Sequence, residues 1–585
     1  MIYLTGYKIN EEIFKSNGST IFRGIRVSDN CPVVIKLLNY EYPTDEDLTL
    51  FNREFEIMKK LDGSSGVIKA YSLEKYSNSL AIVMEDIGGE SIARCLQNVN
   101  LSLNDKLTLA IGITQSLVQV HHKNIIHKDV NPSNFIWNTT TNEVRIIDFG
   151  LSTELTKEAL QLINLNVLKG TLDYISPEQT GRINRPIDNR TDLYSLGVTF
   201  YELFTGQLPF GGSDELELIY NHIAKKPIPP IEINSEIPDM LSNIVMKLMS
   251  KTAEERYQSA FGLLKDLELC QANINANMSP SSSFKLGQYD IVDRFEIPHK
   301  LYGREYEIEM LISGFEKAAN GSSQLLLVSG YSGIGKSSLI HEIRKPVTEK
   351  KGYFISGKFN QFEKNIPYFG ITQSFRELVK QLLSQSQNSL DNWKQKILEA
   401  LGSNGQVIID IIPELEQIIG PQPQLAQLNP LEAQNRFQMT FCQFINVFAK
   451  KEHPLVVFLD DLQWSDTSTL DLIKYILLSG NVEYILFIGA YRDNEVQAGH
   501  QLIEFMEELK NNQQDLGKTF EEIYLKPLEF SSVNNLIADT FHSNTSETEP
   551  LTDIIFHKTK GNPFFVNRIL SSLYFDGALE YHRFS

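Results

Sequence analysis

The sequence predicts a multidomain protein in which an α+β unit over residues 1–270 precedes an α/β unit with a parallel sheet over residues 298–530. Apolar and polar residues alternate in early segments such as TIFRGIRV and LAIVMED, which is typical of antiparallel strands, and a helical pattern follows from about residue 101. In the second unit, strands such as QLLLVSG and PLVVFLDD alternate with helical stretches, which is typical of βαβ units. A mainly helical region is predicted over residues 531–585.

Residues 271–297 differ in composition from both units. The stretch QANINANMSPSSSFKLGQYD is rich in Asn, Ser and small residues and offers few side chains to a core. This composition predicts a linker between the two units.

The charge balance limits the classes of partner. Lys and Arg number 54 and Asp and Glu number 73, so the net charge is 54 − 73 = −19. A chain this acidic is a poor candidate for binding nucleic acid or an anionic membrane through its overall charge. No apolar run reaches the roughly 18 residues that span a bilayer, and the sequence shows neither a signal peptide nor a CxxC pair. We therefore expect a cytoplasmic protein with reduced cysteines, no nucleic acid partner and no membrane insertion.

Five residues of the first unit form a set suited to phosphoryl transfer from ATP, which needs positioned phosphates, one or two Mg²⁺ ions and a carboxylate that orients the attacking hydroxyl. Lys36 ends the apolar strand PVVIK, where it can hold phosphates, and Glu54 lies in a helical pattern, where it can pair with Lys36. HKDVNPSN places Asp129 and Asn134 on one loop, and Asp148 opens DFG after a strand. We assign Asp129 as the catalytic base and predict that Asn134 and Asp148 bind metal.

These motifs resemble, in this order, the eukaryotic-type Ser/Thr protein-kinase family over about the first 270 residues, and the resemblance implies a bilobal fold. In that family the Glu of the motif read here as SPE, Glu178, pairs with a late arginine, and Arg256 in EERYQS is the matching residue. Asp192 in DLYSLG matches the buried Asp that braces the catalytic loop. Thr171 in GTLDY is expected to order the substrate-binding segment.

Three positions depart from the pattern of that family. The glycine-rich loop reads KSNGSTIFRG, with only Gly18 and Gly24, so backbone contact with phosphates is expected to be looser. Asn131 stands where the family has a lysine that faces the γ-phosphate, and loss of one such contact costs roughly a hundred- to a thousandfold in rate at other enzyme sites. Lys128 replaces the arginine of HRD and cannot form the bidentate hydrogen bonds by which an arginine binds a phosphate. We therefore expect the activity of this kinase domain to depend little, if at all, on activation-loop phosphorylation.

The second unit contains a phosphate-binding motif in the context that it needs. LLLVSGYSGIGKSSLI reads as a strand, a glycine-rich loop and a helix, and it fits the pattern GxxxxGK[ST]. The backbone N–H groups of such a loop cradle phosphates, its lysine reaches the β- and γ-phosphates, and its serine binds Mg²⁺. The predicted nucleotide-binding residues are Gly330, Gly333, Gly335, Lys336, Ser337 and Ser338.

A pair of acids follows a later strand of this unit. PLVVFLDD ends in Asp460, which we assign to Mg²⁺, and Asp461, the candidate that activates the attacking water. A solvated turn is the competing interpretation of paired acids, but the preceding P-loop favours the functional one. Arg492 ends another strand, where it either senses the γ-phosphate or lies on the surface.

Residues from about 298 to 585 resemble the STAND-type AAA+ ATPases of large bacterial signalling proteins. The resemblance rests on LYGRE at 301–305, the two nucleotide motifs and KTKGNPFFVNRIL at 558–570. It implies that Pro563 approaches the bound nucleotide and that FDGALEYHRFS begins a winged-helix segment that is cut short. The domain order resembles the N-terminal half of bacterial hybrid proteins that continue into a GAF sensor and a histidine kinase.

These patterns predict a Ser/Thr protein kinase that uses ATP and Mg²⁺ and is coupled to a regulatory P-loop ATPase in signal transduction. The protein substrate is unknown, and the STAND resemblance implies self-assembly when ATP is bound. One alternative is a pseudokinase scaffold beside an ATP/ADP-dependent switch, which Asn131 and the sparse glycine loop favour. An ATPase motor is a weaker alternative, because the acidic chain lacks an obvious basic track for a polymer.

Overall fold

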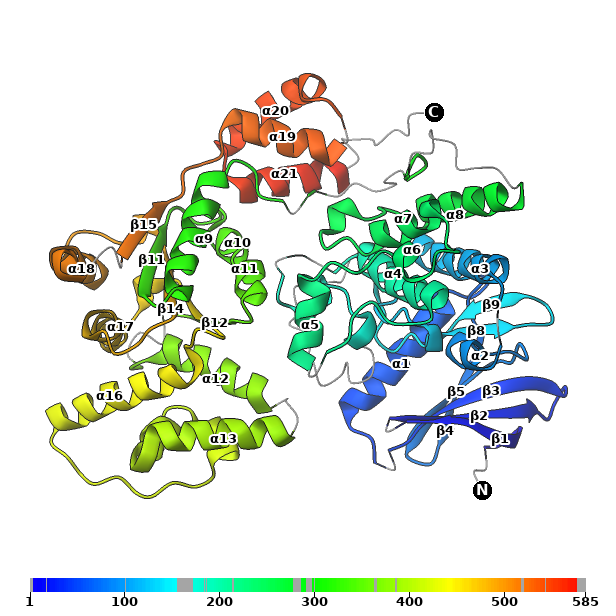
Figure 1. The fold of residues 1–585 in the computed structure, drawn as a ribbon, viewed down its shortest axis with the longest axis horizontal. Helices are drawn as coiled ribbons and strands as arrows, with labels where there is room; N and C mark the ends of the chain where they lie inside the picture. Colours follow the sequence, from blue (N-terminus) through cyan, green and yellow to red (C-terminus); the bar gives the residue numbers. More distant parts are fainter. Residues whose placement is uncertain are drawn as a thin grey trace. The chain divides into compact units, whose positions relative to one another are not determined.

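The computed structural model describes residues 4–16, 18–40, 42–99, 101–154, 172–183, 185, 187–212, 215–276, 286–290, 297–298, 300–361, 366–383, 387–516, 520–541 and 543–575. The chain divides into two compact units (Figure 1), one of Met1–Gly181 with Pro186–Val292 and one of Arg182–Arg185 with Asp293–Ser585. Thr171 and the residues 576–585 predicted to begin a winged helix lie outside the described residues.

A twisted antiparallel sheet begins the first unit, as the alternating pattern predicts. Its order is β1-β2-β3-β5-β4, with β1 at Tyr7–Lys15, β2 at Ser19–Arg26, β3 at Cys31–Leu38, β4 at Ala70–Tyr76 and β5 at Ser79–Glu85. One face buries a small core that includes Val33, Ile35 and Val83, while the opposite face joins the main core of the unit through Ile82 and Met84.

Helix α1 (Asp45–Lys60) packs beside this sheet and begins at a complete capping box. The Thr44 side chain accepts from the Asp47 N–H, and the Asp47 side chain accepts from the Thr44 N–H, so two otherwise unpaired donors are satisfied. The helix buries Phe51, Ile57 and Met58 with the charged Glu54 among them. The local sequence therefore sets both the residue at which the helix begins and the side of the helix that is buried.

The remainder of the first unit is mainly helical (Figure 1), with short strands that carry the loops of the site. These strands form the sheet β6-β8-β9 and the pair β10-β7. The strands are β6 (Glu90–Ser91), β7 (Ile125–Ile126), β8 (Phe135–Asn138), β9 (Glu143–Ile146) and β10 (Thr153–Glu154). The helices are α2 (Ile92–Asn98), α3 (Leu103–His122), α4 (Asn189–Thr205), α5 (Glu215–Ile223), α6 (Pro230–Ile233), α7 (Asp239–Leu248) and α8 (Ala260–Asn275).

Helix α4 lies at the centre of this helical part and is buried on nearly every side. A side chain at Gly197 would collide with its neighbour, since an added Cβ would lie 2.7 Å from the Leu248 Cβ of α7. The helix ends at Gly206, which adopts the left-handed conformation that glycine tolerates best.

The second unit contains a five-stranded parallel sheet in the order β12-β13-β14-β11-β15. Its strands are β11 (Ser323–Ser329), β12 (Tyr353–Lys358), β13 (Leu455–Asp460), β14 (Ile485–Tyr491) and β15 (Phe520–Tyr524). Successive residues of each strand enter two different cores, with Val457 and Phe487 in one and Val456 and Leu486 in the other. Burial of both faces explains why these strands are nearly continuous apolar runs.

Helices cover both faces of this sheet (Figure 1). One side carries α9 (Glu305–Ala319), α10 (Lys336–His341) and α11 (Arg344–Glu349). The other carries α12 (Phe369–Leu383), α13 (Gln387–Leu401), α14 (Gly405–Ile409), α15 (Glu416–Ile419), α16 (Pro430–Phe448), α17 (Thr467–Ser479) and α18 (Gln501–Leu516). Three further helices, α19 (Phe530–Phe541), α20 (Thr545–Thr559) and α21 (Pro563–Phe575), share a separate core with Tyr302 and Leu528.

Part of the predicted linker belongs to the first unit. Helix α8 continues to Asn275, past the predicted boundary at residue 270. Asp290 accepts hydrogen bonds from the backbone N–H groups of Gln258 (2.7 Å) and Ser259 (2.9 Å), just before α8 begins. A linker prediction based on composition is therefore too broad here, because backbone and cap interactions can hold a segment that has few apolar side chains.

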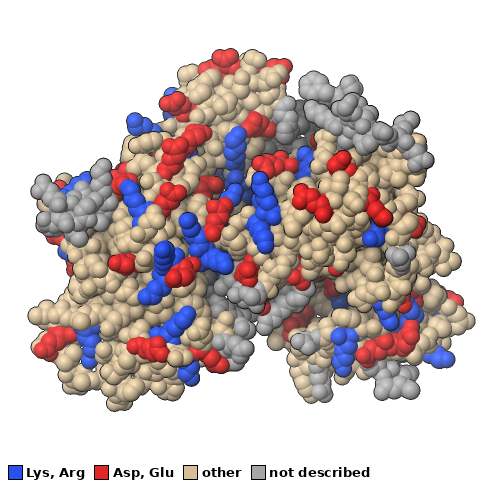
Figure 2. Space-filling model, viewed as in Figure 1, with Lys and Arg blue, Asp and Glu red and all other residues tan. Residues whose placement is uncertain are grey.

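Acidic and basic side chains are interspersed on the face that Figure 2 shows. No extended field of basic residues is visible there, in keeping with the net charge of −19. Among the described residues, none of the helices combines the length and the apolar character that crossing a membrane requires.

Candidate functional site

The first site is built around Lys36 of β3. Its Nζ lies 2.6 Å from Glu54 Oε1 on α1 and 3.0 Å from Asp148 Oδ1. Burial alone would lower the pKa of Lys36, but the two carboxylates outweigh it and raise that pKa. The same interaction lowers the pKa of Asp148 against the opposing effect of burial. Lys36 therefore stays an ammonium and Asp148 a carboxylate at neutral pH.

The loop after β7 is held by a fully buried acid, Asp192 of α4. Its carboxylate accepts from the backbone N–H groups of His127 (2.8 Å) and Lys128 (2.7 Å) and contacts His121 Nε2 at 2.8 Å. The predicted bracing role of Asp192 is confirmed. Lys128 adopts a left-handed conformation (φ 68°), which is costly for a residue with a side chain, so these bonds help to hold the loop.

His127 links this loop to the segment that carries Asp148. The Asp129 N–H donates to His127 Nδ1 at 3.3 Å, so the ring proton resides on Nε2 and is donated to the Ile147 carbonyl at 3.0 Å. Phe149 packs against the same ring edge-on, with 5.0 Å between ring centroids. The base candidate and the metal-binding candidate are thus fixed relative to each other through one buried histidine.

Two amides hold the carboxylate of Asp129. Asn131 Nδ2 lies 2.9 Å from Asp129 Oδ1, and Asn134 Nδ2 lies 2.7 Å from Asp129 Oδ2. Burial raises the pKa of Asp129 despite these donors, which favour the charged form. Because Asn134 uses its nitrogen here, its side-chain oxygen is the atom that can bind a cation.

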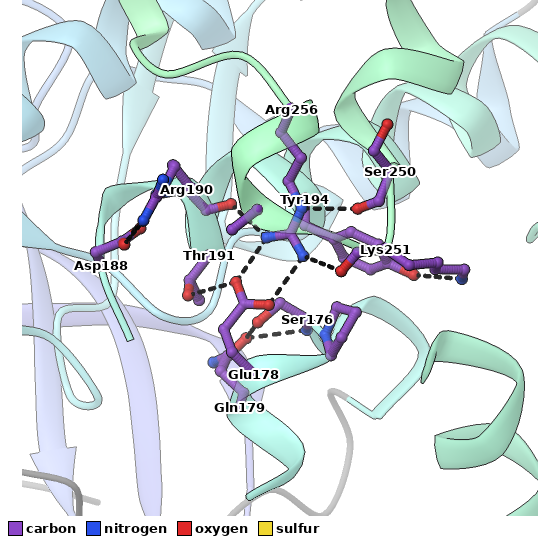
Figure 3. Close-up of polar contacts among 12 residues, drawn as sticks. Ser176, Glu178, Gln179, Asp188, Arg190, Thr191, Tyr194, Ser250, Lys251 and Arg256 are labelled. Carbon is purple, nitrogen blue, oxygen red and sulfur yellow. Dashed lines mark hydrogen bonds and ion pairs between the residues drawn. The ribbon is translucent and has the colours of Figure 1, made fainter. Parts of the chain in front are cut away.

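A buried ion pair anchors the segment that follows the site (Figure 3). Arg256 is 1% exposed and donates to both carboxylate oxygens of Glu178, at 2.6 and 2.9 Å, as the sequence predicts. Thr191 Oγ1 donates to Glu178 at 2.9 Å, and Arg256 also donates to the Arg190 carbonyl at 3.0 Å. Burial would raise the pKa of Glu178, but Arg256 lowers it below its ordinary value.

The glycine-rich segment before β2 is held by hydrogen bonds from Asn39, a residue that sequence reasoning did not select. Asn39 Nδ2 donates to the Ser16 carbonyl at 2.7 Å, and the Asn39 N–H donates to the Gly18 carbonyl at 3.0 Å. Gly24 is required by the sheet, since a Cβ there would lie 2.6 Å from the Lys8 carbonyl oxygen. Of the two glycines, Gly18 is the one in the loop.

The second site lies where β11 ends and α10 begins. Gly330, Gly333 and Gly335 have positive φ values of 149°, 76° and 99°, which side chains other than glycine rarely adopt. Lys336 Nζ folds back onto the carbonyls of Gly330 (2.6 Å) and Tyr331 (2.9 Å), and burial lowers its pKa. Ser337 and Ser338 follow in the first turn of α10.

The paired acids lie at the end of β13, two strands from β11 in the sheet. Burial, with the adjacent Asp461, raises the pKa of Asp460. Asp461 is buried, adopts a left-handed conformation (φ 54°), and contacts Arg492 Nε at 3.3 Å and Lys358 Nζ at 3.3 Å. Gln463 Nε2 donates to Asp461 Oδ1 at 3.0 Å. The structure thus places Arg492 beside the acids, although it also pairs with Glu495 at 2.8 Å.

The start of α21 lies against the glycine-rich loop. Asn562 Nδ2 donates to the Ser332 carbonyl at 3.1 Å, and the Phe564 N–H donates to the Gly333 carbonyl at 3.3 Å. Pro563 lies beside Gly335, with its Cγ 4.0 Å from where a Cβ would stand. The helical region therefore contacts the phosphate-binding loop itself.

Each of the two sites lies in a segment that matches a known domain family. Residues 7–266 match the protein kinase domain family, and residues 300–488 match the AAA ATPase domain family. The chain contains a protein kinase domain followed by an AAA ATPase domain. The bilobal arrangement and the parallel-sheet NTPase fold predicted from the sequence are confirmed.

Curated relatives include both hybrid histidine kinases and Ser/Thr kinases. The chain is 31% identical to hybrid signal transduction histidine kinase G of Dictyostelium discoideum over 82% of its own length and 18% of the relative. It is 23% identical to the peroxide stress-activated histidine kinase mak3 of Schizosaccharomyces pombe over 79% of its length and 23% of the relative. It is 29% identical to a probable serine/threonine-protein kinase of Clostridium acetobutylicum over 46% of its length and 40% of the relative. The chain thus spans about a fifth of the two histidine kinases.

The kinase domain brings together all five residues of the predicted set, Lys36, Glu54, Asp129, Asn134 and Asp148. In the ATPase domain, Asp460, Asp461 and Arg492 lie at one edge of the sheet. Sequence reasoning missed His127, Lys358, Gln463 and Asn562. The position of Lys358 at the end of a strand was the available signal, because parallel strands end at a common edge.

Proposed function

We propose that this protein is a Ser/Thr protein kinase that transfers the ATP γ-phosphoryl group to a protein hydroxyl and is regulated by its own P-loop ATPase domain. The observation that carries the proposal is the ion pair between Lys36 and Glu54 at 2.6 Å, with Asp148 joined to the same ammonium. This pair has to form in an active kinase domain. The relatives named Ser/Thr kinases support the choice of acceptor.

The residues present fit ATP and Mg²⁺. Asp148 and the side-chain oxygen of Asn134 supply the hard oxygen ligands that Mg²⁺ prefers, and Mg²⁺ supplies neutralisation of phosphate charge when bound. Lys36 holds phosphate oxygens as a point charge. Asp129 orients the hydroxyl of the substrate and accepts its proton.

In the ATPase domain, Lys336 and Ser337 would hold the phosphates and Mg²⁺, with Asp460 as a further Mg²⁺ ligand. Asp461 would orient the attacking water, and Arg492, which contacts Asp461 at 3.3 Å, would respond to the γ-phosphate. The contact of Asn562 with the phosphate-binding loop supports a STAND-type switch, in which the helical region follows the state of the nucleotide. Self-assembly with ATP belongs to this proposal, and sedimentation velocity with ATP and with ADP tests it.

A transfer assay tests the kinase proposal. The purified chain is incubated with labelled ATP-Mg²⁺ and a generic protein substrate, beside an Asp129→Ala variant. We expect label on Ser or Thr with the unaltered chain and loss of label with the variant. Absence of transfer, or transfer that survives Asp129→Ala, would refute the kinase assignment.

A pseudokinase scaffold beside an ATP-dependent switch is the second candidate. The observation that favours it is Asn131, an uncharged residue whose amide is engaged with Asp129 at 2.9 Å. It predicts ATP binding without transfer to protein. The same assay separates the two, because only the pseudokinase would bind nucleotide and leave every substrate unlabelled.

A further inference from the structure

Asn131 replaces the lysine that the kinase family has at this position, but its side chain makes hydrogen bonds through both its nitrogen and its oxygen. Its Nδ2 donates to Asp129 Oδ1 at 2.9 Å, and its Oδ1 accepts from the Ser133 N–H at 2.9 Å. The residue is 5% exposed. The Ser133 N–H can only donate, so the amide orientation is fixed with the nitrogen toward Asp129.

We propose that Asn131 is a positioning residue, which holds one oxygen of the Asp129 carboxylate while Asn134 holds the other. This proposal rests on the kinase function proposed above. The two amides approach different oxygens, Oδ1 at 2.9 Å and Oδ2 at 2.7 Å, so rotation of the carboxylate would break both bonds. Both also donate to the Asp129 backbone carbonyl, at 3.3 and 2.8 Å.

The local backbone explains how Asn131 reaches Asp129 so closely. Asn131 is extended (φ −154°, ψ 164°) and caps the 3₁₀ helix Pro132–Asn134, whose first residue is a proline with a fixed φ. The bond from Ser133 N–H is an Asx turn, which orients the side chain through its own backbone. Asn134 ends the same short helix, so a single turn presents both amides.

Asparagine is well suited to this pair of contacts. A lysine could donate to Asp129 but has no acceptor for the Ser133 N–H. A serine can accept from Ser133 through a similar turn, but its hydroxyl is too short to take over the bond to Asp129. An aspartate would set a second carboxylate against Asp129. The side chain that accepts at one end and donates at the other is an amide.

This role makes a prediction that differs from that of a lost phosphate contact. A group that orients Asp129 acts on the chemical step, so its removal lowers kcat and leaves the KM for ATP in place. The test is Asn131→Ser, which keeps the turn and removes the donor. We expect kcat to fall by about tenfold to a hundredfold, the scale on which misplacement of a catalytic group acts, with unchanged KM for ATP. The melting temperature should fall as it does on removal of a buried amide elsewhere in the domain.

A double-mutant cycle shows whether the effect passes through Asp129. In an Asp129→Asn background, Asn131→Ser should lower the residual rate no further, since residues that act as a unit are not additive. The matched control is Asn221→Ser, which removes another buried amide that donates to a backbone carbonyl, that of Gly211 at 2.8 Å. Both variants should lower the melting temperature, but only Asn131→Ser should lower kcat.

Three results would overturn the proposal. These are an unchanged kcat in Asn131→Ser, a fall of the same size in the Asp129→Asn background, or a rise in the KM for ATP as the main effect. If the unaltered chain transfers no phosphate at all, the proposed kinase function fails first and this role fails with it. If the unaltered chain is active and only the cycle is additive, the kinase function stands and the positioning role alone is wrong.

Discussion

The buried charge of Arg256 in the kinase domain is matched by a complete set of partners. The Arg256 guanidinium, 1% exposed, meets both oxygens of Glu178 and three backbone carbonyls, those of Arg190, Ser250 and Lys251 (Figure 3). Removing one partner of such a pair leaves a buried charge uncompensated. The pair thereby fixes the segment around Glu178 to the helical part of the domain.

The Glu178→Gln variant should therefore lose about 3–5 kcal/mol of the unfolding free energy of the kinase domain at neutral pH. The folded-state pKa of Glu178 lies below its ordinary 4.5, so the stability that the pair contributes is present above that pH. As the pH falls through the lower folded-state value, this contribution is lost. Urea titrations at several pH values should show the difference between the two proteins narrowing in acid. A difference that stays constant down to acid pH would contradict this account, and Glu236→Gln, at an exposed position, is the control.

At the scale of elements, the described part of the predicted linker holds the residues that lead into α8, whose N-cap is Ser259. Asp290 accepts from the N–H groups of Gln258 and Ser259 and from Ser259 Oγ at 3.0 Å. Gly262 in the first turn of α8 makes room for it, since a Cβ there would lie 2.5 Å from Asp290. Leu286 packs against the main core, and the Gly287 N–H donates to Asp266 at 2.8 Å. This segment therefore stabilises α8.

Replacement of Asp290 by alanine should lower the unfolding free energy of the kinase domain by about 1–3 kcal/mol, the usual effect of removing a hydrogen-bonded charged group. Urea unfolding followed in the kinase transition measures the loss. Tyr289→Ala, at a neighbouring exposed side chain, should leave stability nearly unchanged. Equal stability of Asp290→Ala and the unaltered chain would show that the segment contributes nothing.

At the scale of the whole molecule, two nucleotide sites belong to two units, each with its own hydrophobic core. A ligand that binds only the folded form stabilises its own unit by mass action, by about 2.7 kcal/mol at a hundred times its Kd. Each unit should therefore report on its own site.

In scanning calorimetry, ATP-Mg²⁺ should thus raise the midpoint temperatures of two unfolding transitions. Lys336→Ala should abolish the rise in the ATPase transition, and Asp148→Ala should reduce it in the kinase transition. If either variant diminished both rises, or left both unchanged, the assignment of one site to each unit would be wrong.

Patterns with local causes were predictable from the sequence, and the family resemblance predicted the distant pair of Glu178 and Arg256. Contacts between distant segments that have neither basis were not predictable. The alternation in β2 and β5, the phosphate-binding loop and the pairing of Lys36 with Glu54 follow from spacing and residue type. Lys358 reaches Asp461 only because β12 pairs with β13 in a register that sets Lys358 beside Asp460. The composition of a segment cannot show that one of its carboxylates, Asp290, accepts from the N–H of Ser259, the N-cap of a helix earlier in the chain. Nor could the presence of Asn131 in place of the lysine of the family show that its amide donates a hydrogen bond to the Asp129 carboxylate.

Paired measurement of phosphate transfer to protein and release of free phosphate tests the central claim most directly. The unaltered chain should do both. Asp129→Ala should abolish transfer and retain release, while Lys336→Ala should abolish the release that the ATPase domain supplies and retain the transfer chemistry. Transfer that persists in Asp129→Ala, or a chain that releases phosphate but labels no protein, would contradict the account of a kinase joined to a regulatory ATPase.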